Sequence, residues 1–321
     1  MKKIKKIFIT GGCGFIGSHL SEFFFNKYKK AQLIIYDKIT YAAHISNLEK
    51  ILKDKRVILI KKDICDLGNL IKCSKNTDLL IHAAAESHVD NSFILSNNFI
   101  KTNILGTKNV MEACLINKIH NIIHISTDEV YGEILRGKFK EDSRLNPSNP
   151  YSSSKAAAEM IVMGYIKSYK LPVKIVRPNN IYGTRQHPEK LIAGCFWCIA
   201  NKKKFTLHGK GNQKRTFLHV HDFCKSVDTI IKKGKNFEFY NVGTNKEFKN
   251  KDLIKLICTT LNVDYKNLVI KVQDRIFNDA RYSICRKKIT KLGWYPQKKM
   301  NADSLKEIFH WTKKNLNNFS R

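Results

Sequence analysis

The chain has 321 residues, of which 43% are hydrophobic, so it can bury one large core with a smaller lobe, or two domains. Its 58 Lys and Arg against 27 Asp and Glu give a formal net charge of +31, which could favour nucleic acid or other anionic partners. The lysines are spread along the whole sequence without a recognised nucleic-acid module, which argues against nucleic-acid binding. We expect the charge mainly to favour encounter with anionic substrates.

No run of about 18 apolar residues indicates a transmembrane helix. The basic N-terminus is followed by an apolar run too short for a signal peptide. The nine cysteines have no framework spacing, as is typical of reduced thiols. Cys195 and Cys198 form a CxxC, but no second pair lies nearby to complete a zinc site, so we expect helix packing and no metal. These features predict a cytoplasmic protein with no membrane partner.

Short apolar runs alternate with longer amphipathic stretches in the first half of the chain. Five runs are typical of buried parallel strands: residues 7–10, 33–36, 57–60, 79–82 and 122–125. Helices are predicted between them, most clearly over 99–117 and 152–169, and a sixth strand over 173–176. This alternation predicts a Rossmann-type, doubly wound parallel α/β sheet. We expect a cofactor-binding and catalytic domain at 1–183 and a smaller C-terminal α/β lobe, mainly for substrate, at 184–321.

A glycine-rich segment follows the first predicted strand. Gly11 would permit a tight turn, Gly14 a close approach of backbone to a pyrophosphate, and Gly17 close packing of helix on strand. The helix N-terminus would then stabilise the phosphate charge. Asp37 ends the second strand about 20 residues later, where a carboxylate accepts hydrogen bonds from ribose hydroxyls. Because this acid would repel an extra phosphate, NAD is favoured over NADP.

Further strand ends fall where such a cofactor would lie. Asp63 and Ile64 follow the third strand, and residues 83–85 follow the fourth. Asp63 is explained equally well as a helix cap. The residues expected to contact the cofactor are Gly11, Gly14, Phe15, Ile16, Gly17, Asp37, Lys38, Thr40, Asp63, Ile64, Ala83, Ala84, Ala85, Thr102, Ser126, Tyr151 and Lys155.

Five candidate catalytic residues follow the fifth strand or begin the next helix. Tyr151 and Lys155 lie four residues apart and share one helix face, where the ammonium and the positive nicotinamide ring would together lower the pKa of the phenol and make it a usable base. Thr127 could hydrogen-bond a substrate hydroxyl. Asp128 and Glu129 would lie at the carboxyl end of a parallel strand; without that context, an Asp-Glu pair is better explained by a solvated loop. Oxidation needs one base, so two further carboxylates indicate oxidation coupled to loss of water.

The chain resembles the nucleotide-sugar 4,6-dehydratases of the extended short-chain dehydrogenase/reductase family over nearly its whole length. The matching segments are residues 84–90, 126–132, 150–155, 188–192 and 278–282. The resemblance implies that Tyr151 takes the O4 proton of glucose while a hydride leaves C4 for NAD. Glu129 would then remove the C5 proton, Asp128 would protonate the departing C6 hydroxyl, and the hydride would return to C6. Thr127 and Lys155 would orient and polarise the reacting groups.

The resemblance also implies a nucleoside diphosphate site, for which cationic and amide donors are suited. The expected substrate contacts are Ser87, Thr127, Asn180, Lys190, Leu191, Leu207, His208, Arg215, Asn250, Arg275 and Asn278. Bacterial dTDP-glucose enzymes usually carry Pro-x-Tyr before the Gly-x-Gly turn and Gly-His-Asp in the late motif. This chain has residues 206–208 as Thr-Leu-His and 277–279 as Phe-Asn-Asp, which look like the dehydratase part of plant-type UDP-rhamnose synthases.

UDP-glucose is therefore the favoured substrate, with dTDP-glucose as the alternative, because the two bases differ by one methyl group. The expected product is UDP-4-keto-6-deoxyglucose, a step toward rhamnose or another deoxysugar that a separate epimerase/reductase would complete. Homodimerisation through the helices near 99–117 and 152–169 is implied by the resemblance. Two rivals are a UDP-sugar 4-epimerase or decarboxylase, which would lack the Thr-Asp-Glu run, and a basic nucleic-acid-binding protein on a Rossmann scaffold.

Overall fold

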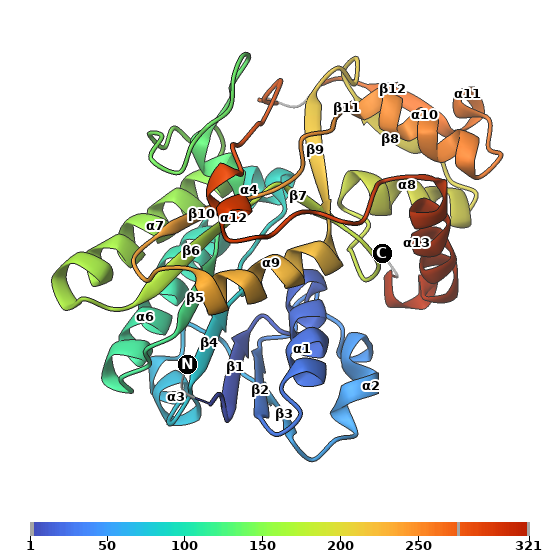
Figure 1. Cartoon of the computed structure of the whole chain (residues 1–321). Helices are drawn as coiled ribbons and strands as arrows, with labels where there is room; N and C mark the ends of the chain where they lie inside the picture. The colour runs from blue at the N-terminus through green and yellow to red at the C-terminus, as the bar shows by residue number, and fades with distance from the viewer. Residues whose placement is uncertain (1–2, 275–276, 320–321) are drawn as a thin grey trace.

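A seven-stranded, all-parallel sheet with helices on both faces forms the centre of the molecule (Figure 1). The structure, a computed structural model, describes residues 3–274 and 277–319. The strand order is β10-β6-β5-β4-β1-β2-β3. The strands are β1 (Lys6–Thr10), β2 (Gln32–Asp37), β3 (Val57–Lys61), β4 (Leu79–His82), β5 (Ile122–Ile125), β6 (Val173–Pro178) and β10 (Phe239–Val242). The predicted Rossmann-type sheet is confirmed.

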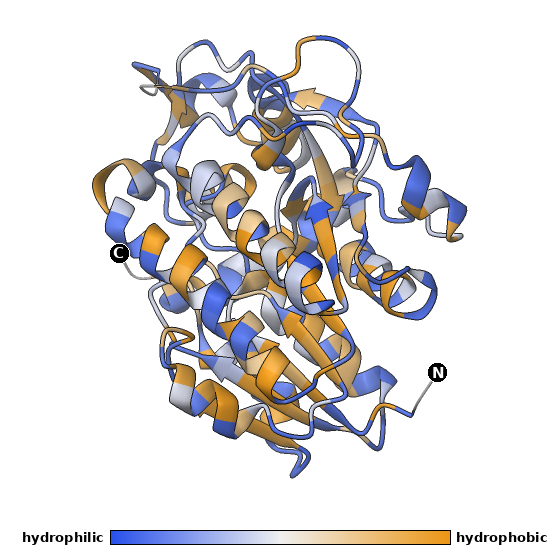
Figure 2. Ribbon diagram, turned by 90° about the vertical axis from the view of Figure 1, so that its left-hand side faces the viewer, coloured by the Kyte–Doolittle hydropathy of each residue, from blue (hydrophilic) through white to orange (hydrophobic). Residues whose placement is uncertain are grey.

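The inner strands are buried on both faces, which is why they are apolar without interruption. Successive side chains alternate between two cores: Ile7 and Ile9 of β1 belong to one, and Phe8 to the other. Helices α1 (Phe15–Lys27) and α9 (Val220–Lys233) cover the first face. The second is covered by α3 (Leu67–Cys73), α6 (Thr107–Ile116) and α7 (Pro150–Tyr169). Figure 2 shows the apolar strands between these helices.

The two helices predicted most clearly are both present, with one difference. The helix α7 begins at Pro150, where Asn149 caps it through a hydrogen bond from Ser152 N–H. The other predicted helix is uninterrupted but changes type: a π-helical segment, η2 (Ile100–Gly106), joins α5 (Ser96–Phe99) to α6. A π-turn is rare inside an α-helix and often marks a functional site. Here it carries Thr102, which lines the cavity described below.

A smaller lobe packs around its own apolar core beside the carboxyl ends of the strands (Figure 1). Two small sheets lie here, β7-β9-β11 and β8-β12. Their strands are β7 (Asn180–Tyr182), β8 (Phe205–His208), β9 (Lys214–His219), β11 (Glu247–Lys249) and β12 (Val269–Val272). The lobe helices are α8 (Leu191–Ala200), α10 (Asn250–Thr260), α11 (Tyr265–Leu268) and α13 (Ala302–Lys314). The remaining short helices are η1 (Ile45–Leu48), α2 (Glu49–Leu52), α4 (Val89–Ile94), η3 (Asp128–Tyr131), α12 (Lys287–Lys291) and η4 (Leu316–Phe319).

The second half of the chain does not stay in the lobe. After β9 it returns through α9, and β10 then pairs with β6 at the edge of the main sheet. The chain thus passes between the lobe and the main sheet more than once. The predicted domain boundary at residue 183 stays a prediction. Among the residues that the structure describes, no helix has the length and apolar character needed to cross a membrane.

Candidate active site

Two adjoining cavities lie at the carboxyl ends of the parallel strands, where open α/β sheets bind their ligands. The first, of about 270 Å³, lies over β1, β2, β4 and β5. The second, of about 600 Å³, lies between the sheet and the lobe. Glu129, Asn180, Glu189 and Lys190 line both cavities. A molecule that extends from one cavity into the other would therefore pass these side chains.

The glycine segment forms the floor of the first cavity. Gly11 has a φ of +69°, and a Cβ there would lie 2.6 Å from the backbone of Ala84. A Cβ on Gly17 would lie 2.0 Å from the carbonyl oxygen of Gly11, so both positions require glycine for packing. A Cβ on Gly14 would meet only that oxygen, at 3.5 Å, so its missing side chain leaves the approach to α1 open. No side chain caps α1 and no acid lies in its first turn, which suits a phosphate at that end.

Asp37 ends β2 and holds the loops around this floor. Its carboxylate accepts hydrogen bonds from the N–H groups of Cys13 at 2.8 Å and Ile39 at 2.7 Å. Burial raises the pKa of Asp37, although these N–H groups oppose the rise. The acid lines the cavity beside Gly14, where a ribose hydroxyl could donate to it. The arrangement fits a dinucleotide: an open helix N-terminus for the pyrophosphate and a carboxylate for the ribose.

Asp63 does not cap the following helix, because Asp66 does so by accepting from Asn69 N–H at 3.0 Å. Instead, Asp63 forms an ion pair with Lys38, with Nζ and Oδ2 2.8 Å apart. Burial alone would raise the pKa of Asp63, but the hydrogen bonds from Lys38 and from the Cys65 N–H hold it below its usual value. The sequence left two explanations for Asp63, a cofactor contact or a helix cap. The structure excludes the helix cap.

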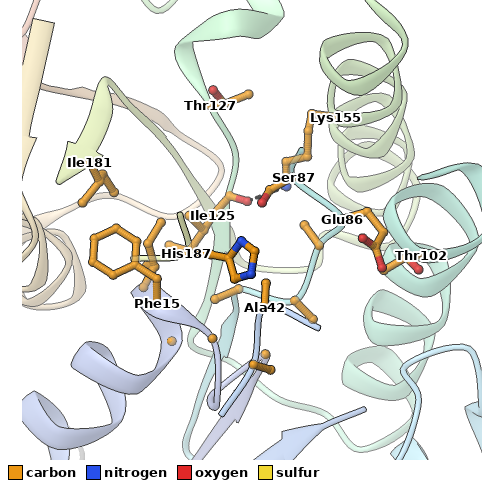
Figure 3. Close-up of a pocket in the computed structure, with 18 of the residues that line it drawn as sticks. Phe15, Ala42, Glu86, Ser87, Thr102, Ile125, Thr127, Lys155, Ile181 and His187 are labelled. Carbon is orange, nitrogen blue, oxygen red and sulfur yellow. Dashed lines mark hydrogen bonds between the residues drawn. The ribbon is translucent and has the colours of Figure 1, made fainter. Parts of the chain in front are cut away.

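All the residues expected to contact a cofactor line the first cavity, from the glycines and Asp37 to Thr102, Ser126, Tyr151 and Lys155. Figure 3 shows Phe15, Thr102 and Lys155 around this space, contributed by α1, η2 and α7. The structure thus brings the expected cofactor-binding residues together around one cavity. The role of each residue remains a proposal.

Tyr151 and Lys155 extend from the first turns of α7 into the first cavity. Tyr151 is 9% exposed and Lys155 is 4% exposed. Burial lowers the pKa of Lys155 to about 8, partly opposed by Glu159, and its Nζ donates to the carbonyl oxygen of Ile125 at 2.8 Å. Burial raises the pKa of Tyr151, and the Glu129 carboxylate adds to the rise. A lowered phenol pKa is thus not present in the protein alone, because desolvation and the nearby carboxylates outweigh the hydrogen bond with Thr127, which is the group that lowers it.

Asp128 and Glu129 begin η3, which follows β5 after Ser126 and Thr127. Asp128 is 3% exposed, and Asn179 Nδ2 donates to its Oδ2 at 2.8 Å. Burial raises the pKa of Asp128 to about 7, so a large share of this carboxyl is protonated near neutral pH. Burial also raises the pKa of Glu129, which Lys190 and Arg215 oppose. The solvated-loop explanation is therefore wrong: the pair is an enclosed acid beside a second carboxylate.

A buried network supports this loop from behind. The Glu159 carboxylate, 0% exposed, accepts from the Ser126 hydroxyl and from Arg177 Nε at 3.0 Å. Arg177 Nη1 also donates to the Tyr131 hydroxyl at 2.6 Å. Since Ser126 and Tyr131 flank the Thr-Asp-Glu run, and Glu159 lies one turn after Lys155, the network fixes both candidate catalytic segments relative to each other.

The second cavity contains most of the residues expected to bind substrate. Those that line it are Asn180, Lys190, Leu191, Leu207, His208, Arg215, Asn250 and Asn278, whereas Ser87 and Thr127 line the first cavity. Arg215 lies over the Tyr282 ring at 4.2 Å and donates through Nη2 to Asp279 O at 2.8 Å. Arg275, the remaining expected residue, lies outside the described residues.

The structure adds cavity residues that the sequence did not single out. Asn179, Glu86, His187 and Glu189 line the first cavity, and Trp197 lines the second. Asn179 directly follows β6, so its place at a strand end was a usable signal. Glu189 lies in the matching segment 188–192, but nothing in its spacing indicated that it would lie between the two cavities.

Comparison with known proteins agrees with this geometry. The family model of GDP-mannose 4,6 dehydratases matches residues 8–305. A dTDP-D-glucose 4,6-dehydratase of Dictyostelium discoideum is 39% identical over 98% of this chain and 83% of its own length. A trifunctional UDP-glucose 4,6-dehydratase/UDP-4-keto-6-deoxy-D-glucose 3,5-epimerase/UDP-4-keto-L-rhamnose-reductase of Arabidopsis thaliana is also 39% identical, over 98% of this chain but 48% of its own length.

Among solved structures, the dTDP-glucose 4,6-dehydratase DesIV from Streptomyces venezuelae, with NAD bound, superposes with a TM-score of 0.94. It is 34% identical, and the match covers 98% of this chain and 99% of that one. Both the predicted fold and the predicted resemblance are confirmed. The chain therefore belongs to the nucleotide-sugar 4,6-dehydratases of the extended short-chain dehydrogenase/reductase family.

Proposed function

We propose that this nucleotide-sugar 4,6-dehydratase uses bound NAD to convert UDP-glucose to UDP-4-keto-6-deoxyglucose, with loss of one water. The observation that carries the proposal is the enclosed group of Asp128, Glu129, Tyr151 and Lys155 at the junction of a dinucleotide-shaped cavity and a second, cation-lined cavity. NAD would be held by the glycine floor, the N-terminus of α1 and Asp37. It supplies a hydride acceptor for C4 that later returns the hydride to C6, and ends unchanged.

Each side chain has a proton to move or a group to hold. Tyr151 takes the O4 proton as C4 is oxidised, and the C4 ketone then acidifies C5–H. Glu129 removes the C5 proton, and its raised pKa makes its ionised form a stronger base. Asp128, with a pKa of about 7, gives its proton to the departing C6 hydroxyl, which leaves as water. A proton returns to C5 when the hydride reaches C6, which balances the reaction.

Lys155 and Thr127 position the reacting groups. Lys155 is held by Ile125 O and lines the first cavity together with Tyr151. The Thr127 hydroxyl is 3.3 Å from Glu129 N–H, which fixes the turn into η3 and leaves the hydroxyl on the cavity side. A positive ring bound near Tyr151 would offset the burial that raises the phenol pKa.

The second cavity supports a nucleoside diphosphate with a pyrimidine base. Lys190 and Arg215 provide cations for the diphosphate, and Asn180 and Asn250 provide amide donors. Leu207, Phe205 and Trp197 offer apolar contact for a flat base. Thr206 and His208 stand where dTDP-glucose enzymes usually have Pro and Tyr, which supports UDP-glucose over dTDP-glucose.

The test of the nucleotide is a side-by-side measurement of kcat/KM with UDP-glucose and dTDP-glucose. We expect the larger value with UDP-glucose, and turnover with both because one methyl group changes binding by only about 1–3 kcal/mol. A larger kcat/KM with dTDP-glucose would make dTDP-glucose the preferred substrate but would leave the dehydration mechanism intact. Release of UDP-galactose without water loss would instead support the epimerase.

A homodimer is part of the proposal. Large apolar side chains are exposed along the segments α4 to α7: Ile94 at 81%, Leu95 at 49%, Ile100 at 53%, Leu105 at 48%, Ile116 at 49%, Met160 at 48% and Tyr169 at 59%. Such a grouping is typical of an interaction surface. Light scattering after gel filtration should give twice the mass of the chain, and Leu105→Glu should give a monomer.

The proposed product keeps a C4 ketone, so another enzyme must consume it. In the Arabidopsis relative, epimerase and reductase activities share one chain with the dehydratase. We propose that a separate epimerase/reductase acts next on the product of this chain, toward rhamnose or another deoxysugar.

A further inference from the structure

Three loops and the C-terminal segment meet over the first cavity. The loop after β2 carries Tyr41 and His44, the loop after β4 carries Ser87 and His88, and the loop after β7 carries His187 and Glu189. The first cavity is lined by Ala42, Ala43, Glu86, Ser87, His187 and Glu189 from these loops, and Figure 3 shows Ala42, Glu86, Ser87 and His187 at this cavity. These loop residues border the space above the glycine floor.

The carboxylate of Glu189 is the point at which these loops meet. Its side chain is only 4% exposed. Its Oε2 lies 3.5 Å from His187 Nδ1 and 4.0 Å from His88 Nδ1, and its Oε1 lies 3.8 Å from Lys190 Nζ. Burial alone would raise the pKa of Glu189, but His187, Lys190 and His88 hold it at about 2, so the carboxylate is ionised. A buried charge of this kind needs its partners, because removing them leaves it unsolvated.

Further contacts join the loops in pairs. Lys190 Nζ donates to Ser87 O at 2.6 Å, which links the loop after β7 to the loop after β4. The rings of Tyr41 and His187 meet edge to face with centroids 5.3 Å apart, which links it to the loop after β2. That last loop is fixed to the glycine floor, because His44 N–H donates to Cys13 O at 3.1 Å.

The C-terminal segment closes the arrangement from outside. Phe319, at the end of η4 and 4% exposed, packs edge to face on His44 at 5.6 Å and on His187 at 6.0 Å. Asn318 Nδ2 also donates to Ser46 Oγ at 3.1 Å. Phe319 therefore holds together two loops that come from distant parts of the sequence.

We propose that Glu189 is the positioning residue of a latch, made by His88, His187, Tyr41 and Phe319 with it, that keeps the dinucleotide on the protein throughout turnover. The inference rests on the NAD use proposed above, but not on the identity of the nucleotide-sugar. A latch is needed because the hydride taken from C4 must return to the same sugar at C6. If the reduced dinucleotide left between these steps, the enzyme would be stranded with an oxidised sugar.

The experiment measures dissociation of NAD without sugar. Protein loaded with NAD is diluted into an enzyme system that destroys free NAD, and the NAD still bound is measured over time. Glu189→Gln keeps the shape of the side chain but removes its charge. Loss of the ion pair with Lys190 and weaker contacts with the two imidazoles are expected to accelerate dissociation by about ten- to a hundredfold. The matched control is Glu238→Gln, which removes a carboxylate that pairs with Lys288 away from both cavities, and it should dissociate like the unaltered protein.

A second variant tests the latch from outside both cavities. Phe319→Leu keeps an apolar side chain but loses the edge-on ring contacts, and we expect NAD to dissociate about two- to tenfold faster. Its kcat should be restored by excess NAD, and its turnover without added NAD should release reduced dinucleotide into solution. If Glu189→Gln does not fold, Phe319→Leu carries the test. Dissociation unchanged in Phe319→Leu, or in folded Glu189→Gln, would overturn the latch, whereas failure of the unaltered protein to bind NAD would overturn the proposed cofactor instead.

Discussion

The two cavities of this enzyme are built in different ways. The first lies on the carboxyl ends of adjacent parallel strands, so the glycine floor, Asp37 and the Thr-Asp-Glu run are placed by the sheet itself. The second is enclosed by lobe segments from distant parts of the chain, among them α8, β8 and β9. We therefore expect the sheet to position the groups that carry the chemistry and the lobe to select the nucleotide-sugar.

The largest expected effects come from the catalytic group in the sheet. Glu129→Gln removes the base for C5 but leaves Tyr151 and Lys155, so water loss should slow by about 10²- to 10⁴-fold while C4 oxidation persists. Single-turnover absorbance should show reduced dinucleotide accumulating on the enzyme. Tyr151→Phe is the matched control, since it should prevent that accumulation. Normal turnover by Glu129→Gln would remove Glu129 from its role.

Two glycine variants separate packing from cofactor binding in the first cavity. Gly17→Ala places a Cβ 2.0 Å from a backbone oxygen, so it should lower the melting temperature as well as NAD binding. Gly14→Ala places a Cβ 3.5 Å from its nearest neighbour, so it should fold normally and weaken NAD binding about tenfold or more. Calorimetry and NAD titration measure the two effects. Equal NAD affinity in Gly14→Ala and the unaltered protein would show that the dinucleotide does not approach this backbone.

The raised pKa of Asp128 predicts a pH dependence. Because its proton is given to the leaving hydroxyl, kcat/KM should fall as pH rises above about 7, where this carboxyl ionises in the free enzyme. The same shift acts on stability: the folded protein keeps a proton that the unfolded chain releases near its ordinary pKa of about 4. The stability contributed by protonated Asp128 is therefore present below about pH 4 and lost as pH rises through about 7.

Asp128→Asn checks both consequences. Its residual activity should lack the decline near pH 7. The melting temperature of the variant, minus that of the unaltered protein, should increase as pH rises from 4 to 8. A constant difference in melting temperature across this range would contradict the raised pKa.

The smallest expected effect concerns the lobe. Replacing Thr206 and His208 together by Pro and Tyr should shift the ratio of kcat/KM toward dTDP-glucose by about tenfold or less, with little change in kcat. Arg215→Lys is a useful contrast, since it should raise the KM for both substrates alike by losing a planar, multi-donor contact. A double variant with an unchanged ratio would place base selection elsewhere in the second cavity.

Most of the first cavity could be predicted from the sequence, because its glycine floor, Asp37 and the Thr-Asp-Glu run lie at the ends of strands. Residues at the carboxyl ends of parallel strands converge at one edge, so Gly11, Asp37 and Asp128 could be placed together without long-range information. The return of α9 and β10 to the main sheet could not be predicted, since a buried run such as 239–242 does not specify its neighbour. Contacts such as those of Phe319 with His44 and His187 depend on packing between distant segments, which periodicity does not report.

The central claim is tested most directly by following UDP-glucose to product on the purified protein with mass spectrometry. The account predicts a UDP-sugar lighter by one water, formed without net consumption of NAD and with a larger kcat/KM than for dTDP-glucose. A product of unchanged mass, identified as UDP-galactose, would contradict the coupling of oxidation to water loss by Asp128 and Glu129.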